Sequence, residues 1–425
     1  MSLAAGLPAP VDACGIDFGT SNSTAGWSRP GQSALLALEG DKLTLPSVIF
    51  FHAEDFHVSY GRAALADYLD GHEGRLMRSL KILLGTSMMD EHTEVAGRAV
   101  PFRTLLAQFI GELKRRTDLA AGHQFCSAVL GRPVFFVDGD PVADQRAQDT
   151  LEGAARRAGL QHIAFQYEPI AAAFDYESQV AREELVLVVD IGGGTSDFTL
   201  IRVGPERAQR AERRGDILAS GGVHIGGTDF DRALSLAGMM PELGLGSLLK
   251  SGREVPSSHY FNLATWHTIN QAYTKKAGLQ IAELYRDAMD KPRLERLQTV
   301  VRERAGHWLA LQVEAAKIAL SGADRAQIDI GRICASESIL MHRLDFDRAI
   351  GALVASIGQT VAGLIGDAGI TAGDIDTVFF TGGSSGVPLL RERVLALVPQ
   401  ARCVEGDLFG SIGAGLALDA QRKFA

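Results

Sequence analysis

Two glycine-rich clusters each follow an aspartate that ends an apolar run. Asp17 precedes a cluster over residues 19–23, and Asp190 precedes another over residues 192–197. Turns of glycine, serine and threonine expose backbone N–H groups that can approach a phosphate without obstruction by a Cβ atom. Carboxylates beside a phosphate repel it unless a cation lies between them, and Mg²⁺ favours few carboxylates together with phosphate oxygens and water. We therefore predict two facing turns that clamp a polyphosphate, with Mg²⁺ between the phosphates and the carboxylates of Asp17 and Asp190. The residues predicted to contact phosphate are Gly19, Thr20, Ser21, Asn22, Gly192, Gly193, Gly194 and Thr195.

A third cluster, residues 382–386, also follows an apolar run. One such cluster alone is often an ordinary turn with an Asx cap, but three favour a binding site. The third also fits the G-x-S-x-G pattern of a hydrolase nucleophile elbow, which requires a histidine downstream of the serine. The last histidine, His342, lies upstream of Ser384, so Ser384 is not predicted to be a nucleophile. The chain also lacks the G-x-x-x-x-G-K-[ST], strand-linked G-x-G-x-x-G and H-E-x-x-H patterns, which argues against P-loop, Rossmann and zinc-protease sites.

The elements that must position these clusters can be read from the apolar runs. Short β-branched stretches that end in turn residues indicate buried strands. The first two clusters resemble each other in their order of strand, aspartate, glycine and threonine, which predicts a duplicated α/β domain whose halves each open with a β-hairpin. Strands are expected over residues 14–18, 184–191, 198–203 and 376–381, helices over 144–159, 168–176, 294–321 and 353–368, and a flexible insertion over 241–258.

Composition limits the class of protein. The chain has 425 residues, 46% of them hydrophobic, and a net charge of −9, which suits a globular protein of two or three domains. The negative charge argues against a nucleic-acid partner, because phosphate backbones require clustered lysine and arginine. There is no apolar stretch of membrane-spanning length and no leader-like N-terminus, and the four cysteines are scattered. A cytoplasmic location without a membrane span is therefore expected.

The three clusters resemble, in order, the phosphate-1, phosphate-2 and adenosine motifs of the actin-like ATPase superfamily. Within it, the chain resembles the DnaK-type heat-shock chaperones, and in its length the short, YegD-type members without a substrate-binding domain. Residues 168–173, 224–231 and 314–321 resemble that family's E-P-T-A-A-A, H-L-G-G-x-D-F-D and E-x-A-K-x-x-L-S segments.

The resemblance implies an α/β fold of the actin-like ATPase type. Two lobes, each built on a duplicated RNase H-like mixed sheet, would enclose a nucleotide cleft. Lobe I is expected over residues 1–182 and lobe II over 183–425, with a mostly helical insertion at about 229–325 and the C-terminal helix packed back on lobe I.

The resemblance also implies roles for single residues, with ATP or ADP and Mg²⁺ as cofactors. Asp17 and Asp190 would hold the Mg²⁺ through water. Thr20 and Thr195 would lie near the γ-phosphate, and Glu168 and Asp197 would position the metal waters and the attacking water. Lys81 matches the family's catalytic lysine, although an ordinary solvated lysine is the alternative. Catalytic roles are thus implied for Lys81, Glu168, Asp197 and Thr195, and further nucleotide contacts for Gly226, Gly227, Glu314, Lys317, Ser321, Gly382, Gly383, Ser384 and Asp407.

Two positions depart from the family pattern. Ile318 and Gly386 stand where the family has arginines that flank the adenine. Guanidinium stacking on a base contributes roughly 0.5–2 kcal/mol per contact. We therefore expect nucleotide binding that is weaker or less selective for the base.

These expectations favour a slow Mg²⁺-dependent ATPase in which ATP and ADP set the angle between two lobes. An unknown protein client or regulator would then read the cleft closure. Two alternatives remain open. One is an actin-like scaffold or filament protein with little turnover, and the other is a small-molecule kinase of the sugar-kinase type, although no sugar-kinase signature is present.

Overall fold

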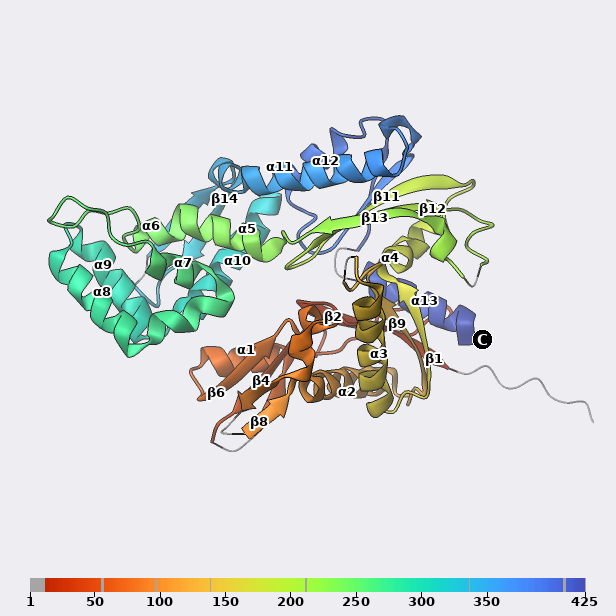
Figure 1. Cartoon of the computed structure of the whole chain (residues 1–425), viewed down its shortest axis with the longest axis horizontal. Helices are drawn as coiled ribbons and strands as arrows, with labels where there is room; N and C mark the ends of the chain where they lie inside the picture. Colours follow the sequence, from red (N-terminus) through yellow and green to blue (C-terminus); the bar gives the residue numbers. More distant parts are fainter. Residues whose placement is uncertain are drawn as a thin grey trace, which may run out of the picture.

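The first of two similar sheets is built from residues near the start of the chain (Figure 1). The structure, a computed structural model, describes residues 12–424 apart from 55–56, 96–97, 138, 211, 336 and 408–409. The sheet has the order β10-β9-β1-β2-β3. β2 pairs antiparallel with both β1 and β3, whereas β9 and β10 run parallel to β1. The strands are β1 (Ala13–Asp17), β2 (Asn22–Gly26), β3 (Thr44–Pro46), β9 (Ser127–Arg132) and β10 (His162–Tyr167).

The second sheet repeats this arrangement strand for strand. Its order is β13-β12-β11-β16-β17, with an antiparallel β11–β12–β13 part and with β16 and β17 parallel to β11. Like the first sheet, it opens with a hairpin whose turn carries a glycine cluster. This repeat agrees with the predicted duplication. The strands are β11 (Glu184–Ile191), β12 (Ser196–Val203), β13 (Ile217–Val223), β16 (Thr377–Thr381) and β17 (Arg402–Glu405).

Helices cover both faces of the sheets. α2 (Phe102–Ala121) and α3 (Pro141–Arg157) supply the apolar residues that pack outside the first sheet. α4 (Glu168–Glu177) and α13 (Ser411–Phe424) share one apolar cluster with Val129 of β9 and Val186 of β11, so they form the core that joins the two sheets. The outer face of the second sheet is covered by α5 (Gly227–Leu234), α11 (Arg343–Asp367) and α12 (Pro388–Leu395).

Two smaller regions lie beyond the sheets. One extends the first sheet region with β4 (Val48–His52), β5 (Val58–Tyr60), α1 (Gly61–Leu69), β6 (Gly74–Arg78), η1 (Leu80–Leu83), η2 (Ser87–Asp90), β7 (His92–Val95) and β8 (Arg98–Pro101). The other is mostly helical and lies at the left of Figure 1. It contains η4 (Ser235–Met239), α6 (Met240–Glu242), α7 (Ser258–Ala264), η5 (Trp266–Tyr273), α8 (Lys275–Asp287), α9 (Lys291–Arg302), α10 (Gly306–Gly322), β14 (Arg325–Asp329) and β15 (Ser338–His342). Short 3₁₀ turns η3 (Arg214–Asp216) and η6 (Ala372–Asp374) complete the elements.

Three expected elements differ from the structure. The single helix expected over residues 294–321 is two helices, α9 and α10, because the chain turns at Arg304, whose φ is +48°. The helix expected from residue 353 begins earlier, at Arg343. Segment 241–258 was expected to be flexible, yet Leu243 and Val255 within it are buried in the core.

One helix in the described part of the chain, α11, is long and apolar enough to cross a membrane by length and composition. Core helices of soluble proteins pass the same test. Ile350, Val354 and Ile357 of α11 are buried in the core of the second sheet region, so packing accounts for its apolar character.

Candidate functional site

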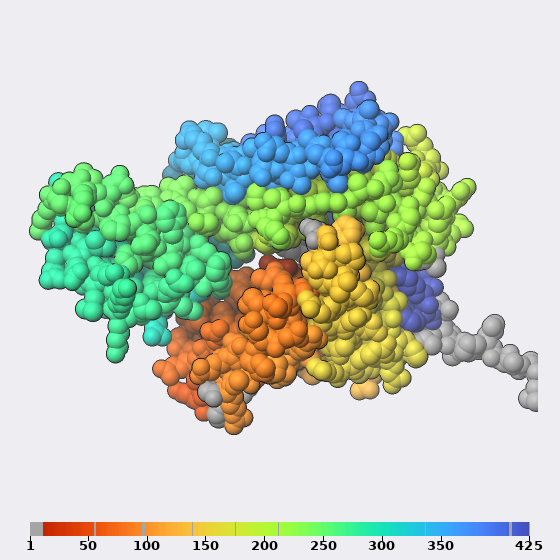
Figure 2. Space-filling model, in the orientation of Figure 1, coloured from red at the N-terminus to blue at the C-terminus, as the bar shows by residue number. Residues whose placement is uncertain are grey.

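The two predicted phosphate turns lie against each other. The first joins β1 to β2, and the second joins β11 to β12, the corresponding strands of the two sheets. A Cβ atom placed on Gly193 would lie 2.0 Å from the Oγ of Ser21, so the two turns contact each other closely at this point. The surface is indented between the orange and green parts of the chain (Figure 2). The repeated topology thus places both glycine clusters at one position.

Buried carboxylates crowd beneath the turns. Asp17 ends β1, and Asp190 pairs with Asp197 across the hairpin ladder. The pKa of Asp17 is raised to about 7, first by burial and then by the charge of Glu168. The pKa of Asp190 is raised to about 8, first by burial and then by the charges of Asp197 and Glu168. The cluster therefore carries more negative charge than its surroundings stabilise.

Lys81 lies within this cluster. Its Nζ donates a hydrogen bond of 2.7 Å to Glu168 Oε1, and the two side chains are only 12% and 11% exposed. Burial tends to lower the pKa of Lys81, but the charges of Glu168, Asp17 and Asp190 together raise it, so the amine stays protonated. Ser79, the residue before η1, adopts a left-handed conformation with φ +60°, which is uncommon outside glycine and turns the chain into η1. A solvated surface lysine does not fit these contacts.

The donor set suits a magnesium ion. Asp17 and Asp190 supply hard carboxylate oxygens, and burial and neighbouring carboxylates raise their pKa values. A divalent cation beside them would stabilise their charged forms. Across the described ranges, no three histidine, cysteine, aspartate or glutamate side chains are arranged to hold a metal by themselves. Mg²⁺ does not need three protein ligands, because it keeps several waters and takes one or two carboxylates together with phosphate oxygens.

The second turn is supported from behind by the segment that starts α5. Gly227 N–H donates to Gly192 O at 2.9 Å, and Thr228 N–H donates to Gly193 O at 2.8 Å. A Cβ atom on Gly226 would lie 2.6 Å from the carbonyl group of Gly193. These contacts hold the turn in shape. At its far end Thr195 Oγ1 donates to Asp197 Oδ2 at 2.9 Å.

The third cluster and α10 complete the site. Gly382 has φ +81°, and a Cβ atom there would lie 2.3 Å from Asp190 Oδ1. Ser384 Oγ would lie 2.2 Å from a Cβ atom on Gly227, so the third turn contacts the start of α5. From α10, the buried Lys317 Nζ lies 2.9 Å from Asp231 Oδ1 and donates to Gly227 O at 3.3 Å.

The remaining predicted residues lie around this centre with fewer contacts to it. Thr20 and Asn22 are half-buried in the first turn, and Gly383 is exposed in the third. Glu314 lies one turn before Lys317 on α10. Burial is the largest cause of the raised pKa of Asp231, about 6; Lys317 lowers this pKa and the charge of Glu314 raises it. Ser321 Oγ donates to Lys317 O within α10. Asp407 is exposed after β17, with its carboxylate beside Gly410. Ile318 is 59% exposed.

Sequence reasoning missed a set of contacts that joins the region of β4–β6 to the helical region. We call these contacts, made by Tyr68, Arg78, Trp266, Asn270 and His307, the rim contact. Tyr68 Oη lies 2.9 Å from His307 Nδ1 and donates to Asn270 Oδ1 at 3.1 Å. The guanidinium of Arg78 lies 4.3 Å from the ring centroid of Trp266. No local pattern in the sequence signals such pairs.

The rim contact should weaken in acid. The pKa of His307 is lowered to about 4, chiefly by burial and to a smaller extent by the charge of Arg78, while a hydrogen bond with Trp266 O acts in the opposite direction. Once separated, His307 regains an ordinary pKa near 6.5. The open form therefore binds more protons between these values, so the contact is complete above about pH 6.5 and is lost as the pH falls toward about 4. Tyr68 and Tyr273, the other titratable side chains beside this ring, stay neutral throughout that range.

Emission of Trp266, measured in a protein whose Trp27 and Trp308 are replaced by phenylalanine, would report this opening. We expect a shift to the red over that pH range, with far-ultraviolet circular dichroism unchanged. The variant His307→Gln should lack the shift. A Trp266 emission wavelength that does not change with pH when His307 is present would contradict the prediction.

The repeated sheets and the three converging turns define a mixed α/β protein with a site between two similar sheets, the architecture that the actin-like resemblance implies. The chain matches the family model described as Hsp70 protein over residues 92–237 and 284–419. These stretches make up more than half of the chain, so the chain belongs to the Hsp70 family, and the expected heat-shock chaperone family is confirmed.

Among curated relatives, the chain is similar to Chaperone protein HscA of Citrobacter koseri, with 27% identity over 96% of this chain and 58% of the relative. HscA of Klebsiella pneumoniae strain 342 gives the same values. A Chaperone protein HscA homolog of Pseudomonas paraeruginosa is 31% identical over 57% of this chain and 39% of the relative. The chain spans less than two thirds of the length of these relatives.

Proposed function

We propose that this chain binds ATP and ADP with Mg²⁺ and is a slow ATPase of the chaperone type. Its two lobes, taken as residues 1–182 and 183–425, would close around the nucleotide, and the degree of closure would control binding of a protein partner. The observation that supports this most is the meeting of two glycine turns over Asp17, Asp190 and the Lys81–Glu168 pair. The relatives are named as chaperones, which supports the proposed class of function.

Different groups of site residues would bind phosphate, hold Mg²⁺ and orient water. Backbone N–H groups of the turns would bind phosphate oxygens, while Asp17 and Asp190 would hold Mg²⁺ through water. The bound ion would neutralise charge on the phosphates. Lys81 keeps its proton and would donate it in a hydrogen bond toward the charge that develops on the transferred phosphate. Glu168 orients Lys81 and, with Thr195 and Asp197, would orient the attacking water.

The nucleoside would lie between α10 and the third turn. Glu314, Lys317 and Ser321 are presented by α10, and Gly383 and Ser384 by the turn, with Asp407 nearby. Ile318, exposed in place of a stacking arginine, would give only apolar contact to a base. We also infer a cytoplasmic location. The free thiols of the four cysteines are consistent with a reducing compartment.

Calorimetric titration of nucleotide-free protein with Mg·ATP tests the proposal. We expect saturable binding on the order of micromolar, about −8 kcal/mol, that needs Mg²⁺ and discriminates little against Mg·GTP. Asp17→Asn and Asp190→Asn should each abolish the Mg²⁺-dependent part. Because burial and neighbouring charges raise the pKa of Asp190, the neutral asparagine should also raise the melting temperature.

The matched control is Asp149→Asn, which changes an exposed aspartate on α3. It should leave both nucleotide binding and melting temperature unchanged. Unchanged Mg·ATP binding in both site variants would refute the assignment of the site. An absence of binding in the parent protein would refute the ATPase proposal itself.

A further inference from the structure

Arg78, the last residue of β6, carries a guanidinium group whose donors are unused. The group lies over the ring of Trp266, 4.3 Å from the ring centroid. Among the residues that the structure describes, it donates no hydrogen bond and forms no ion pair. The ring holds the group in place, but it offers no oxygen to accept from the five N–H groups of a guanidinium. Arg78 is therefore fixed in position with its donors available to a ligand.

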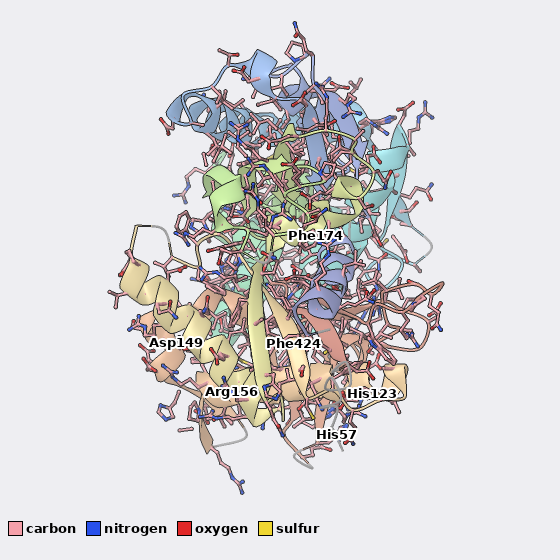
Figure 3. The ribbon with its side chains drawn as sticks, turned by 90° about the vertical axis from the view of Figure 1, so that its right-hand side faces the viewer. His57, His123, Asp149, Arg156, Phe174 and Phe424 are labelled. Atoms are coloured by element: carbon pink, nitrogen blue, oxygen red, sulfur yellow. The ribbon has the colours of Figure 1, made fainter. Side chains whose placement is uncertain are left out.

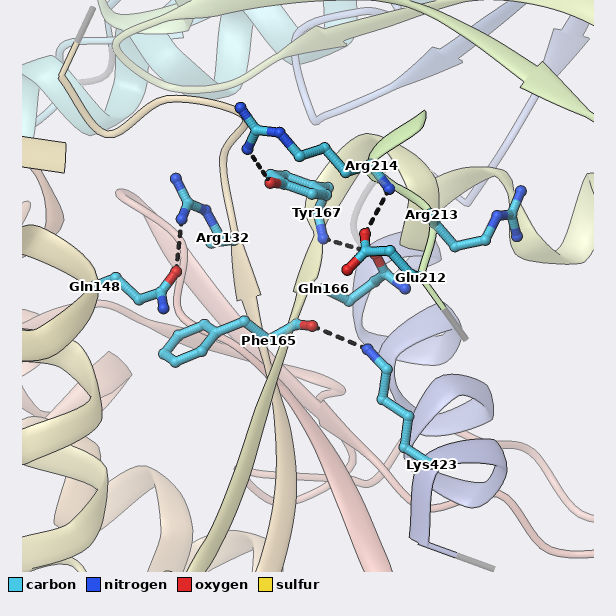
Figure 4. Close-up of a pocket in the computed structure, with 9 residues that line it drawn as sticks. All are labelled: Arg132, Gln148, Phe165, Gln166, Tyr167, Glu212, Arg213, Arg214 and Lys423. Carbon is cyan, nitrogen blue, oxygen red and sulfur yellow. Dashed lines mark hydrogen bonds between the residues drawn. The ribbon is translucent and has the colours of Figure 1, made fainter. Parts of the chain in front are cut away.

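Arginines elsewhere in the described part of the chain have acceptors even where they are exposed. Arg156 lies on α3 (Figure 3), is 54% exposed and pairs with Glu152 at 2.6 Å. In the pocket of Figure 4, Arg214 Nη1 donates to Tyr167 Oη at 2.7 Å. Arg78 is half-buried, and removal of a cation from water is costly unless the cation is paired. The missing acceptor of Arg78 therefore calls for an explanation.

Glu314, on α10, is an acceptor in the same condition. It is half-buried, and within the described ranges its carboxylate accepts no hydrogen bond and forms no ion pair. The pKa of Arg78 is lowered, first by burial, while the charge of Glu314 and then that of Asp231 act in the opposite direction. Both carboxylates thus lie within electrostatic reach of the guanidinium. Asp231 is already paired with Lys317 at 2.9 Å, so Glu314 is the carboxylate that has no partner.

An unpaired donor group and an unpaired acceptor group near each other suit a ligand that both accepts and donates. A hydroxyl group does both, and the ribose of a nucleotide carries two neighbouring hydroxyls. One would accept from a guanidinium while the other donates to a carboxylate. Ile318, one turn after Glu314 on α10, is 59% exposed and has no polar side-chain atom. This side of the site therefore offers more to a sugar than to a base.

We propose that Arg78 binds the ribose of the nucleotide, opposite Glu314, and determines specificity for a ribonucleotide. The inference rests on the proposed nucleotide site and adds to it a residue that sequence reasoning missed. The guanidinium of Arg78 would donate to one ribose hydroxyl, and the carboxylate of Glu314 would accept from the other. Arg78 belongs to the region of β4–β6 and Glu314 to the helical region. A bound ribose would thus join these two regions, whereas a sugar without the two hydroxyls would not.

Calorimetric titration with Mg·ATP and with the Mg²⁺ complex of 2′,3′-dideoxy-ATP tests the assignment. The variant is Arg78→Met, because methionine keeps an unbranched side chain against Trp266 but has no donor. The parent protein should bind the dideoxy nucleotide more weakly than ATP, by roughly tenfold or more. Arg78→Met should bind Mg·ATP about tenfold more weakly than the parent, the usual effect of losing one hydrogen bond to a charged group. Its affinity for the dideoxy nucleotide should equal that of the parent.

Arg75→Met is the matched control. Arg75 is exposed on the same strand and donates to Thr93 Oγ1 at 3.4 Å, so its loss should leave the affinities for both nucleotides unchanged. Arg78→Lys keeps a positive charge and N–H donors, and its affinity for Mg·ATP should lie between those of the parent and Arg78→Met. Arg78→Met should weaken Mg·ATP and Mg·GTP by the same factor, because the two nucleotides share the ribose.

The ratio of the two affinities separates ribose binding from a purely structural role. An equal loss of affinity for ATP and dideoxy-ATP in Arg78→Met would show that Arg78 only holds the rim contact together, and would overturn the proposal. Parent-like Mg·ATP binding by this variant would overturn it too, as would a changed ratio of ATP to GTP affinity, which would place Arg78 at the base. All three results leave the nucleotide site intact. Absence of Mg·ATP binding in the parent would instead refute the site, and this proposal with it.

Discussion

Replacement of Lys81 by alanine is expected to lower ATP turnover by about 10²- to 10³-fold while Mg·ATP binding remains. The protonated amine is held 2.7 Å from Glu168 in a buried cluster of carboxylates. Its charge would matter most when charge develops on the transferred phosphate, and less when the ground-state nucleotide binds. Single-turnover phosphate release measures the first effect, and calorimetry measures the second.

Lys114→Ala is the matched control for this experiment. Lys114 is buried to a similar extent, 13% exposed, and pairs with Asp118 on the same helix, α2. Loss of a buried ion pair should lower the melting temperature in both variants, but only Lys81→Ala should lose turnover. Parent-like turnover in Lys81→Ala would show that the lysine is structural.

Replacement of Gly415 by alanine is expected to reduce the free energy of unfolding by about 3 kcal/mol. Gly415 lies where α13 crosses α4, and a Cβ atom there would lie 1.9 Å from the backbone oxygen of Ala171. A backbone oxygen inside a helix cannot rotate away as a side chain can. The two helices would have to separate, which would open the core between the two sheets. Urea unfolding followed by circular dichroism measures the change.

The control is Gly363→Ala in α11, where a Cβ atom would meet open space. Alanine is favoured over glycine in a helix by about 0.5–1 kcal/mol, so this variant should gain stability. The two substitutions are chemically identical, but their expected changes in the free energy of unfolding have opposite signs. A gain in stability for Gly415→Ala would mean that α13 does not pack against α4 at this distance.

The hairpins could be predicted because their signal is local. The β-branched run from Glu184 to Ile191 ends at a glycine cluster, and β11 has those bounds in the structure. β1, expected over residues 14–18, spans Ala13–Asp17. The convergence of the three glycine clusters followed from their similarity and from the family resemblance. The roles of the individual site residues stay predictions until they are measured.

The features that could not be predicted from the sequence depend on contacts between residues that are distant in the chain. The chain turns at Arg304 between α9 and α10, and Gly306 at the start of α10 packs so closely that a Cβ atom would lie 2.7 Å and 2.8 Å from the side chains of Tyr273 and Ile269. Apolar periodicity alone continues through this break. Segment 241–258 has the composition of a loop, yet Tyr260 Oη donates to Leu243 O at 3.2 Å and holds it in the core. The rim contact likewise joins residues from distant parts of the chain.

The position of α13 has a consequence for how the chain is made. β1 lies near the start of the sequence and is covered by α13 near its end, with Gly15 so close to Leu416 and Ala417 that a Cβ atom would lie 2.3 Å from a backbone nitrogen. Contacts between such distant residues form slowly, because a long loop must close first. On the ribosome, the face of the first sheet that α13 covers stays exposed until residues 411–424 have emerged, and exposed apolar surface of this kind promotes aggregation. A member of a chaperone family is thus itself a nascent chain that needs protection during its own synthesis.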